Sequence, residues 1–560
     1  MNFFRKISAV LKTYDYRDKI ISAFAVALFL LMIVKMTVFP YGLFGFGDTD
    51  LYTEGIVSRS GIQNVNPLFV DYNEADREVS SLVFSGLMKY DPENKTVVED
   101  VARVSISEDK KEYTFRIREG IKWHDGRPLI ADDVYFTFGE IIKDPAFQNE
   151  ILKTNFEGVQ IDLVDDRTVK FTLEKPNVFF VSNFTVGILP KHVLGNVFAG
   201  DLLESDFNRN PIGTGPYKVR DAVESFPDGR TQIVLERNPD YYGERPGIEL
   251  MRFLAYPTMD ALVERVDSVN GVSKVSGRHI PYFDDSDRFD LIPYELPQYV
   301  AVFMNMESEA LKNRQKIRLA LQKAIEKDDL IGDSRDKIRV DTPLMELDQD
   351  EWVYQADFDQ AQGAMKDSGY SYDSEDVDHE GLRYDSDGNS LELRLIARLY
   401  DEGTYQFEET LKVVEFLEQS WRDIGVDIRT DFLPQEEFNN QIMLRSYDLL
   451  LVGQILGYNL DTYSYWHSTQ AGPRGQNFSN YKSFRVDSLI EAIRSTFDKE
   501  EKETRLGELG KILREDVPAV FLYRPVYYYA TDGKASGIDM SGLVFSSDRF
   551  AKISSWSLVK

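Results

Sequence analysis

Near its amino end the chain carries one long apolar run. Residues 20–34 are apolar or weakly polar without interruption, a lysine breaks the run, and residues 36–39 resume it. A membrane-spanning helix needs about 20 such residues, and a lysine near its end can reach the lipid headgroups. Five basic residues against two acidic ones in residues 1–19 keep that segment in the cytoplasm by the positive-inside rule. We therefore expect a transmembrane anchor at residues 20–39 and a linker at residues 40–52.

Two other interpretations of this run stay open. Residues 20–34 alone have the length of a signal-peptide core, but the stretch KMTVFPYGLFGFGDTD that follows lacks the usual small-residue cleavage site. A buried core helix fits less well, since basic residues precede the run and a Gly-rich aromatic segment follows it. We prefer an uncleaved anchor, with the rest of the chain outside the cytoplasm.

The composition of the whole chain is that of a largely soluble fold. At ~150 residues per domain, 560 residues correspond to about three or four compact units. The chain has 65 Lys plus Arg and 94 Asp plus Glu, a formal net charge of −29 that would repel phosphate backbones, so we expect no nucleic-acid partner. Because there is no cysteine, disulfides, thiolate metal sites and cysteine-linked lipids are excluded.

Local patterns after the linker predict a mixed α/β or α+β fold. Short alternating segments and amphipathic segments are interspersed with Gly, Pro and Asp turn signals. Alternation of apolar and polar side chains predicts strands at residues 113–120, 168–174 and 426–432. Apolar residues spaced i, i+3, i+4 predict helices at residues 314–331 and 410–425.

No motif of a catalytic or metal site stands out. Nucleophile-elbow, zinc-protease, P-loop and dinucleotide-binding patterns are missing, and the five histidines have no metal-ligand spacing. We expect no enzyme activity, no cofactor and no metal. An acidic segment does place Asp376, Asp378, Glu380 and Asp387 at roughly calcium-loop spacing, but two ligand positions deviate. We prefer a solvated acidic loop there.

Five segments, taken in order, resemble the blocks of one known family. They are residues 82–102, 113–138, 211–219, 237–248 and 477–525. The second is the most specific, because it contains WHDG and ADDV intact. Together they are similar to the extracytoplasmic solute-binding proteins of family 5, the peptide- and nickel-binding components of ABC importers. WHDG supplies a turn and ADDV a helix start, so these motifs identify a fold more than a ligand.

The resemblance implies an architecture. We expect an α/β, two-lobed periplasmic-binding-protein-like fold of type II with an extra subdomain, preceded here by the one transmembrane helix. Lobe I would span residues 53–290, with the extra subdomain at about 85–205, lobe II residues 291–519, and residues 520–560 would return to lobe I. A ligand would bind between the lobes, which close around it by hinge motion.

The resemblance also implies where a ligand binds. In peptide-binding members the ligand lies extended, pairs with strand edges, and commonly has its amino terminus held by an acidic side chain. Here Gln454 stands at the family's tryptophan position and Gly457 at its amine-binding aspartate position. Two alternatives follow: Asp461 takes over the amine contact, or the contact is missing altogether. The expected site residues are Ile62, Gln63 and Asn64 from the first lobe, and Gln454, Ile455, Leu456, Gly457, Tyr458, Asn459 and Asp461 from the second.

The function implied by the resemblance is that of a membrane-anchored, extracytoplasmic receptor. It would capture oligopeptides and deliver them to an ABC permease and its ATPases, and its anchor would replace the lipid that many family members carry. Two alternatives remain open: a receptor for a sugar or metal chelate, and a sensor or chaperone that kept the fold without transport. No histidine falls among the expected site residues, which disfavours direct nickel binding.

Overall fold

The computed structural model describes residues 50–347, 349–372, 381–402, 404–458, 460–473 and 475–559. The chain divides into two units, Met1–Leu51 and Tyr52–Lys560, and the second holds nearly all of these residues. Within the described ranges, no helix is both long and apolar enough to cross a membrane. The anchor predicted at residues 20–39 lies outside them.

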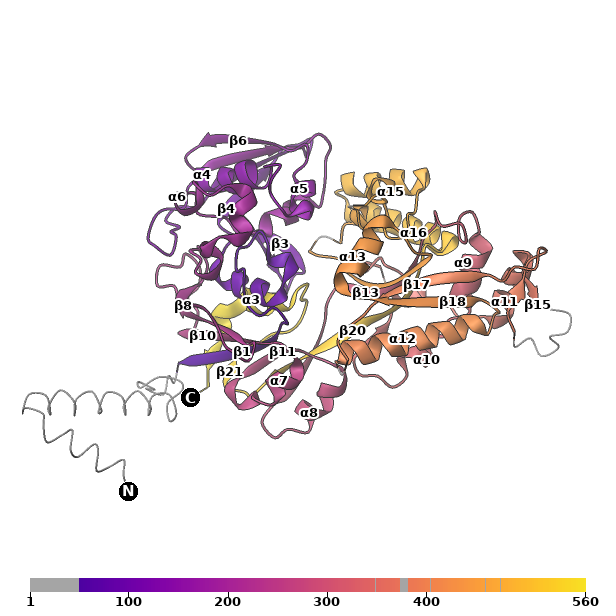
Figure 1. Cartoon of the computed structure of the whole chain (residues 1–560). Coiled ribbons are helices and arrows are strands. Elements are labelled where there is room, and N and C mark those ends of the chain that lie inside the picture. Colours follow the sequence, from indigo (N-terminus) through magenta and orange to yellow (C-terminus); the bar gives the residue numbers. More distant parts are fainter. Residues whose placement is uncertain are drawn as a thin grey trace, which may run out of the picture. The chain divides into compact units, whose positions relative to one another are not determined.

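One twelve-stranded sheet runs through the second unit. Its strands follow the order β18-β17-β19-β13-β20-β11-β1-β10-β9-β8, and β12 and β14 pair with β20 beside this path (Figure 1). β17 runs parallel to β18 and β19, whereas β12, β13 and β14 run antiparallel to β20. The strands are β1 (Leu51–Val57), β8 (Tyr217–Ser225), β9 (Thr231–Arg237), β10 (Leu250–Tyr256), β11 (Gly271–Val275), β12 (Asp290–Glu295), β13 (Gln298–Met304), β14 (Lys337–Arg339), β17 (Glu392–Arg398), β18 (Asp427–Leu433), β19 (Leu449–Ile455) and β20 (Ala519–Thr531).

Strand β20 belongs to both ends of this sheet. It begins beside β13 and ends beside β12 and β11, so one continuous strand of 13 residues serves two lobes. The chain crosses in the opposite direction through β12 and β13, which Leu296 and Pro297 join. At this crossing the guanidinium of Arg524 lies 2.6 Å from the carboxylate of Glu295. Two antiparallel connections therefore link the lobes.

Lobe II is a three-layer sandwich around β13, β14, β17, β18, β19 and the start of β20. Alternation along β13 directs Val302 into the core on one face and Ala301 and Phe303 into the core on the other. Helices α9, α11 and α12 cover the first face, and α13, α15 and α16 the second (Figure 1). The helices of this lobe are α9 (Gln315–Lys323), α10 (Lys327–Ile331), α11 (Phe358–Asp367), α12 (Tyr405–Arg422), α13 (Gln435–Leu444), α14 (Tyr463–Trp466), α15 (Phe484–Ser495) and α16 (Lys499–Asp516), with a short hairpin of β15 (Ser371–Tyr372) and β16 (Arg383–Tyr384).

Lobe I holds the other end of the sheet and a smaller layer, and the buried apolar residues of the two form one continuous core. In that layer a separate sheet, β4-β5-β7-β6, packs against a cluster of phenylalanines whose ring centroids lie 4.4–6.3 Å apart. The cluster consists of Phe115, Phe138, Phe156, Phe171 and Phe184. The remaining elements are β2 (Met88–Asp91), β3 (Thr96–Glu99), β4 (Ala102–Ile106), β5 (Glu112–Ile117), β6 (Gln160–Asp165), β7 (Thr168–Thr172), β21 (Ala535–Ser536), β22 (Ser557–Leu558), α3 (Glu74–Val83), α4 (Ala131–Tyr135) with the π-helix Phe136–Ile141, α5 (Glu150–Asn155), α6 (Lys191–Leu194), α7 (Met259–Val263) and α8 (Ile280–Asp284).

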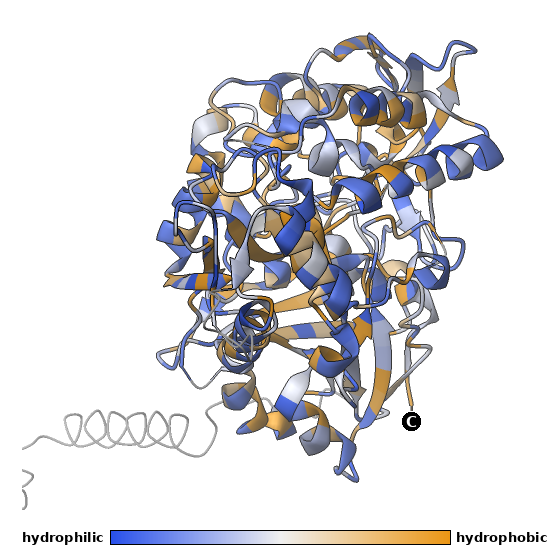
Figure 2. Ribbon diagram, turned by 90° about the vertical axis from the view of Figure 1, so that its right-hand side faces the viewer, coloured by the Kyte–Doolittle hydropathy of each residue, from blue (hydrophilic) through white to orange (hydrophobic). Residues whose placement is uncertain are grey.

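A buried ion cluster ties the end of the chain to lobe I. Arg549, from the 3-10 helix Ser546–Ser555, is fully buried with Glu54 of β1 and Glu78 of α3, and its guanidinium lies 2.5 Å from Glu78 and 3.2 Å from Glu54. Burial raises the pKa of Glu54, although Arg549 opposes that shift. Breaking such a cluster by removing one partner would leave an unpaired buried charge. Figure 2 shows how the strands carry most of the hydrophobic colour while the outer helices expose hydrophilic stretches.

The WHDG and ADDV segment forms a structural corner of lobe I. Gly126, at φ +89°, turns the chain after Trp123, whose indole Nε1 donates to the Asp133 carboxylate at 3.2 Å. His124 Nδ1 accepts from the backbone N–H of Gly213 at 3.1 Å, which joins this motif to the later PIGTGPY block. A Cβ on Gly213 would lie 1.9 Å from a backbone carbonyl oxygen of α3, so only glycine fits there. These contacts explain the motifs without a ligand.

The mixed α/β fold is confirmed, and so are all the predicted strands and one of the two predicted helices. The predicted strands at residues 113–120, 168–174 and 426–432 are β5, β7 and β18, shifted by a residue or a few at their ends. The helix predicted over residues 410–425 is the larger part of α12, and ADDV begins α4.

One predicted helix is wrong in its continuity. The pattern predicts a single helix over residues 314–331, but the structure contains two, α9 and α10. The carboxylate of Glu326 accepts a hydrogen bond from the backbone N–H of Asp328 and caps the start of α10. A capping side chain in mid-pattern therefore divides the segment.

Candidate functional site

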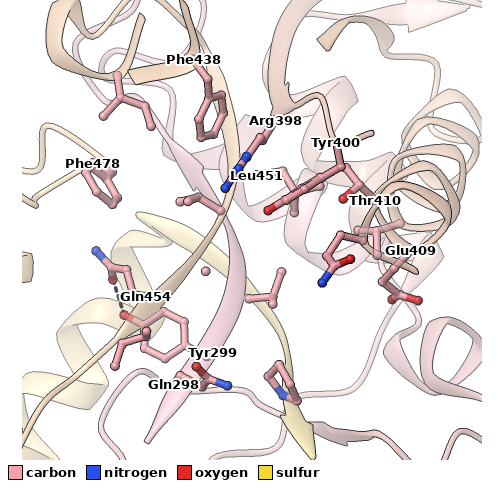
Figure 3. A pocket seen from close by; sticks show the side chains of 18 of the residues that line it. Gln298, Tyr299, Arg398, Tyr400, Glu409, Thr410, Phe438, Leu451, Gln454 and Phe478 are labelled. Atoms are coloured by element: carbon pink, nitrogen blue, oxygen red, sulfur yellow. Dashed lines mark hydrogen bonds between the residues drawn. The ribbon is translucent and has the colours of Figure 1, made fainter. Parts of the chain in front are cut away.

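A hollow of about 760 Å³ opens in lobe II and is called here the lobe II pocket (Figure 3). It lies at the carboxyl ends of the parallel strands β17 and β18, where α/β sheets typically bind ligands. Its volume is within the usual range of about 300–1,000 Å³ for ligand sites. Its lining comes from β13, β17, β19, β20, α12 and α13, and includes Gln298, Tyr299, Arg398, Tyr400, Glu409, Phe438, Ile442, Leu451, Gly453, Gln454, Ile455, Phe478 and Tyr523.

A second hollow, of about 790 Å³, lies between the lobes and is called the interlobe pocket. Lobe I contributes side chains from β1, α3 and β11, and lobe II contributes the segment after β17 and the start of α12. Arg398, Tyr400, Tyr405 and Tyr527 line both hollows, so the two adjoin. Together they form one site bordered by both lobes.

Apolar and amide side chains dominate the lobe II pocket. Phe438 and Phe478 flank it on one side, as Figure 3 shows, and Leu451 lies near its centre. Tyr299 donates a 2.6 Å hydrogen bond to Gln454 Oε1, while Gln454 Nε2 donates to a backbone carbonyl at 3.1 Å. These two bonds fix the amide plane of Gln454. The wall can therefore accept an apolar group beside a fixed polar one.

The carboxylate in this pocket, Glu409, is already neutralised. Lys337 Nζ lies 2.9 Å from it, and the hydroxyl of Tyr523 donates to it at 3.1 Å. Burial, with Glu409 nearby, raises the pKa of Tyr523 well above its ordinary value, so the hydroxyl keeps its proton. The carboxylate of Glu409 is therefore already bonded to Lys337 and Tyr523.

Ion pairs connect the lobes across the interlobe pocket. Arg59 of lobe I lies 2.9 Å from Asp401 of lobe II, and Arg278 of lobe I lies 3.1 Å from Glu408. All four side chains are substantially exposed, so each pair contributes little to stability. Such pairs can break and form at low cost when the lobes move. In the described part of the chain, no group of three or more His, Cys, Asp or Glu side chains is placed to hold a metal ion.

Residues 96–476 match the family model of the bacterial extracellular solute-binding proteins, family 5, whose middle part that model describes. The chain belongs to this family. A relative, the oligopeptide-binding protein AppA of Bacillus subtilis (strain 168), is 26% identical over 496 residues, or 83% of this chain and 85% of AppA. The resemblance found in the sequence is thereby confirmed.

Solved family 5 structures share the two-lobed fold. The structure of AppA from Bacillus subtilis in complex with a nonapeptide has a TM-score of 0.74 at 22% identity and covers 91% of this chain and 99% of that one. The structure of NikZ from Campylobacter jejuni in complex with Ni(L-His) has a TM-score of 0.75 at 24% identity, with the same coverage. At these identities the likeness shows the fold and not the ligand.

Two of the site residues expected from the family 5 resemblance line the lobe II pocket. Gln454 is buried in its wall, and Ile455 is 51% exposed at its rim. The next residue, Leu456, is buried in the core with Trp466. Of the predicted site segment, only Gln454 and Ile455 line the lobe II pocket among the described residues.

Gly457 and Tyr458 line a different hollow, behind the β12–β13 crossing. Tyr458 packs against Tyr90 of lobe I at 4.8 Å between ring centroids and donates a 2.8 Å hydrogen bond to Asp548. This contact joins lobe II to lobe I. Asn459 lies outside the described residues.

Asp461, expected to take over the amine contact, is bound by protein groups. Its carboxylate lies 3.0 Å from Arg494 and also accepts from the backbone N–H of Tyr463. Burial raises its pKa, and Arg494 opposes that shift. Among the described residues that line the lobe II pocket and the interlobe pocket, Asp461 does not appear.

The three expected residues of lobe I are also placed away from these pockets. Ile62 is fully buried, and the backbone N–H of Gln63 donates to the carboxylate of Asp76 at 2.7 Å. The amide of Asn64 donates to a backbone carbonyl at 3.3 Å. In the acidic segment, for which we prefer a solvated loop, Asp376, Asp378 and Glu380 lie outside the described residues.

The family resemblance does not point to Arg398, Tyr400 or Phe438. Arg398 is the last residue of β17, Tyr400 lies two residues after it, and Phe438 lies on α13 after β18. A signal for them exists, because ligands bind at the carboxyl ends of parallel strands. Applying that rule to the segment LRLIARLY would have selected Arg398 and Tyr400.

Proposed function

We propose that this protein is the extracytoplasmic receptor of an ABC importer, which captures oligopeptides between its two lobes and delivers them to the permease and its ATPases. The observation that carries the proposal is the pair of adjoining hollows, the lobe II pocket and the interlobe pocket, which share lining residues and are bordered by both lobes. The name of AppA, an oligopeptide-binding protein, supports a peptide ligand. No covalent chemistry is assigned to this chain.

We propose the lobe boundaries expected from the sequence. Lobe I comprises residues 53–290, with its extra subdomain at about 85–205, lobe II comprises residues 291–519, and residues 520–560 return to lobe I. The crossing through β12 and β13 and the shared strand β20 support these limits. Closure would bend the chain at the two crossing strands.

We propose Gln454 and Ile455 as ligand contacts, together with Tyr400 and Phe438. Their place in the pocket wall supports this assignment. For Asp461 the ion pair with Arg494 supports a structural role instead of an amine contact. Asp461→Asn should then leave peptide affinity unchanged in a calorimetric titration, and a loss of affinity would restore the amine contact.

We propose that residues 20–39 anchor the receptor in the cytoplasmic membrane, with residues 1–19 inside and residues 40–52 as the linker. The apolar run and the basic residues before it support this topology. An anchor raises the effective concentration of the receptor at its permease. Deleting residues 1–47 should move the protein from the membrane fraction to the soluble fraction, and an unchanged membrane fraction would contradict the anchor.

The ligand can be identified on the full-length chain, purified gently in mild detergent. Denaturation of the purified protein followed by mass spectrometry should release peptides of varied sequence. An empty protein would then be titrated calorimetrically with a peptide pool, a sugar panel and nickel–histidine. Heat from a sugar or the nickel chelate, with none from peptides, would contradict the proposed ligand class.

A further inference from the structure

The carboxylates that line the lobe II and interlobe pockets are all engaged by protein cations, within the described residues. Each has an ion-pair partner close by. The pairs are Glu409 with Lys337, Glu74 with Lys274, Asp260 with Arg278, and Asp401 with Arg59. In this structure, each described carboxylate that lines the site therefore already has a protein cation beside it.

Arg398 is the contrasting case. It is half-buried at the end of β17 and lines both pockets. Among the described residues no carboxylate lies within 4.0 Å of it, and its buried Nε has no hydrogen-bond partner. Its neighbour is the ring of Tyr400, with the guanidinium 4.5 Å from the ring centroid. Figure 3 shows the tips of Arg398 and Tyr400 converging on the pocket.

A second arginine on the same strand shows what Arg398 lacks. Arg394 lies on the same face of β17, and its Nε bonds to Asp431 of β18 at 2.7 Å. In the β17–β18 register Asp431 stands two residues beyond the partner of Arg394, and the equivalent position for Arg398 is Gln435. Gln435 carries a neutral amide, which already donates to Asn439. The chain thus supplies a counter-ion for one arginine and leaves the other to face the pocket.

A half-buried guanidinium that lines a pocket and has no ion-pair partner among the described residues can bind the carboxylate of a ligand. Its planar fork can form two parallel N–H···O bonds to a carboxylate, and charge-assisted bonds of this kind are stronger than neutral ones. Taking a charged group out of water without a partner is costly, so a bound anion would offset that cost. Apolar side chains, including Phe438, Ile442 and Phe478, line the same pocket.

We propose that Arg398 binds a carboxylate of the ligand, and that the receptor selects peptides by their free carboxyl terminus and does not require a free amino terminus. The apolar wall then holds the residues next to that carboxylate. This inference rests on the proposed function, since it names the group by which the same site recognises its peptide.

The test uses four pools of one hexapeptide library with interior residues drawn from uncharged amino acids only. The pools have both termini free, an acetylated amino end, an amidated carboxyl end, or both ends blocked. The full-length chain is mixed with all four pools, and the retained peptides are counted by mass spectrometry. Pools with a free carboxylate should be enriched about tenfold or more over amidated pools, with or without acetylation.

Variants locate the contact. Arg398→Gln should abolish the preference for the carboxylate, whereas Arg398→Lys should keep part of it, because a lysine retains the charge without the fork. Arg429→Gln is the matched control, since Arg429 is 71% exposed on β18 outside both pockets, and it should keep the full preference. Circular dichroism and urea unfolding of Arg398→Gln would verify that the variant is folded.

The outcomes separate the two claims. Equal retention of all four pools, or an unchanged preference in Arg398→Gln, would overturn the carboxylate inference and leave peptide binding intact. Selection for free amino termini alone would also overturn it. Retention of none of the pools would overturn the proposed peptide function, and the inference with it.

Discussion

Single residues of lobe II decide whether its pocket can be occupied. Gly453 of β19 lines the lobe II pocket, and a Cβ placed on it would meet one described heavy atom within 4 Å, the carbonyl oxygen of Tyr299 at 3.5 Å. The backbone therefore tolerates a side chain there. A large one would enter the space that we assign to the ligand.

Gly453→Leu should weaken peptide binding by about tenfold or more, because misfits of even a methylene in a pocket are costly. Calorimetric titration would measure the change. Gly363→Leu is the matched control, since Gly363 is exposed on α11 with nothing within 4 Å of its Cβ position. Unchanged affinity in Gly453→Leu would show that the ligand binds elsewhere.

Tyr458 is predicted from the sequence to contact the ligand, but in the structure it lies outside the lobe II and interlobe pockets. Tyr458→Phe removes the hydrogen bond to the buried Asp548, and we expect a stability loss of about 1 kcal/mol in urea unfolding. Peptide affinity should stay the same. The reverse pattern, with stability unchanged and affinity lowered, would support the ligand contact predicted from the sequence.

Residue identity alone does not distinguish a free arginine from a paired one. Arg394 and Arg398 occupy similar positions in one alternating strand, and the difference lies in Asp431 of β18 and Gln435 at the start of α13. That comparison needs the β17–β18 register, which no local pattern contains. The segment of Gln454 and Ile455 could be selected from the sequence because a family motif marks it, and both residues line the lobe II pocket.

At the scale of elements, the motif segments act as structural joints between distant parts of lobe I. His124 accepts a hydrogen bond from the backbone of Gly213 through Nδ1, and its Nε2 lies 3.2 Å from the carbonyl oxygen of Gly215. This arrangement requires a neutral ring. Burial lowers the pKa of His124 to about 4.

The pKa of His124 predicts a pH dependence of stability. The unfolded chain takes up a proton near pH 6.5 and the folded chain only near pH 4, so stability falls as pH decreases between these values. At about 1.4 kcal/mol per pH unit over about 2.5 units, the loss in the free energy of unfolding is at most ~3.5 kcal/mol. Urea unfolding from pH 7 to 4 should show a smaller loss in His124→Gln than in the wild type. Equal losses in both proteins would contradict this account.

Elements with a clear apolar period could be predicted, and a break caused by a single side chain could not. Strands β5 and β7 alternate cleanly because one face is buried, so their sequence carries the pattern. The break between α9 and α10 depends on one capping side chain, Glu326, inside a continuous helical pattern. The spacing of apolar residues along the sequence gives no sign of such a cap.

For the whole molecule, the shared strand β20 is the feature that makes two lobes out of one sheet. It is antiparallel to β12 at one end and to β13 at the other, so bending there changes the distance between the lobes. The family resemblance predicts this two-lobed plan. Composition and periodicity alone do not, because they carry no information on which strands pair.

Closure of the lobes around a peptide is the central claim, and a third hollow offers a place to measure it. This hollow, of about 600 Å³, is lined by Glu157 of lobe I and Gln470 of lobe II. The chain has no cysteine, so Glu157→Cys and Gln470→Cys together provide the two spin-label sites, and no other residue is labelled. Double electron–electron resonance on the labelled full-length chain should show a shorter label distance after a free-carboxylate peptide pool is added. An unchanged distance distribution at saturating peptide would contradict the account.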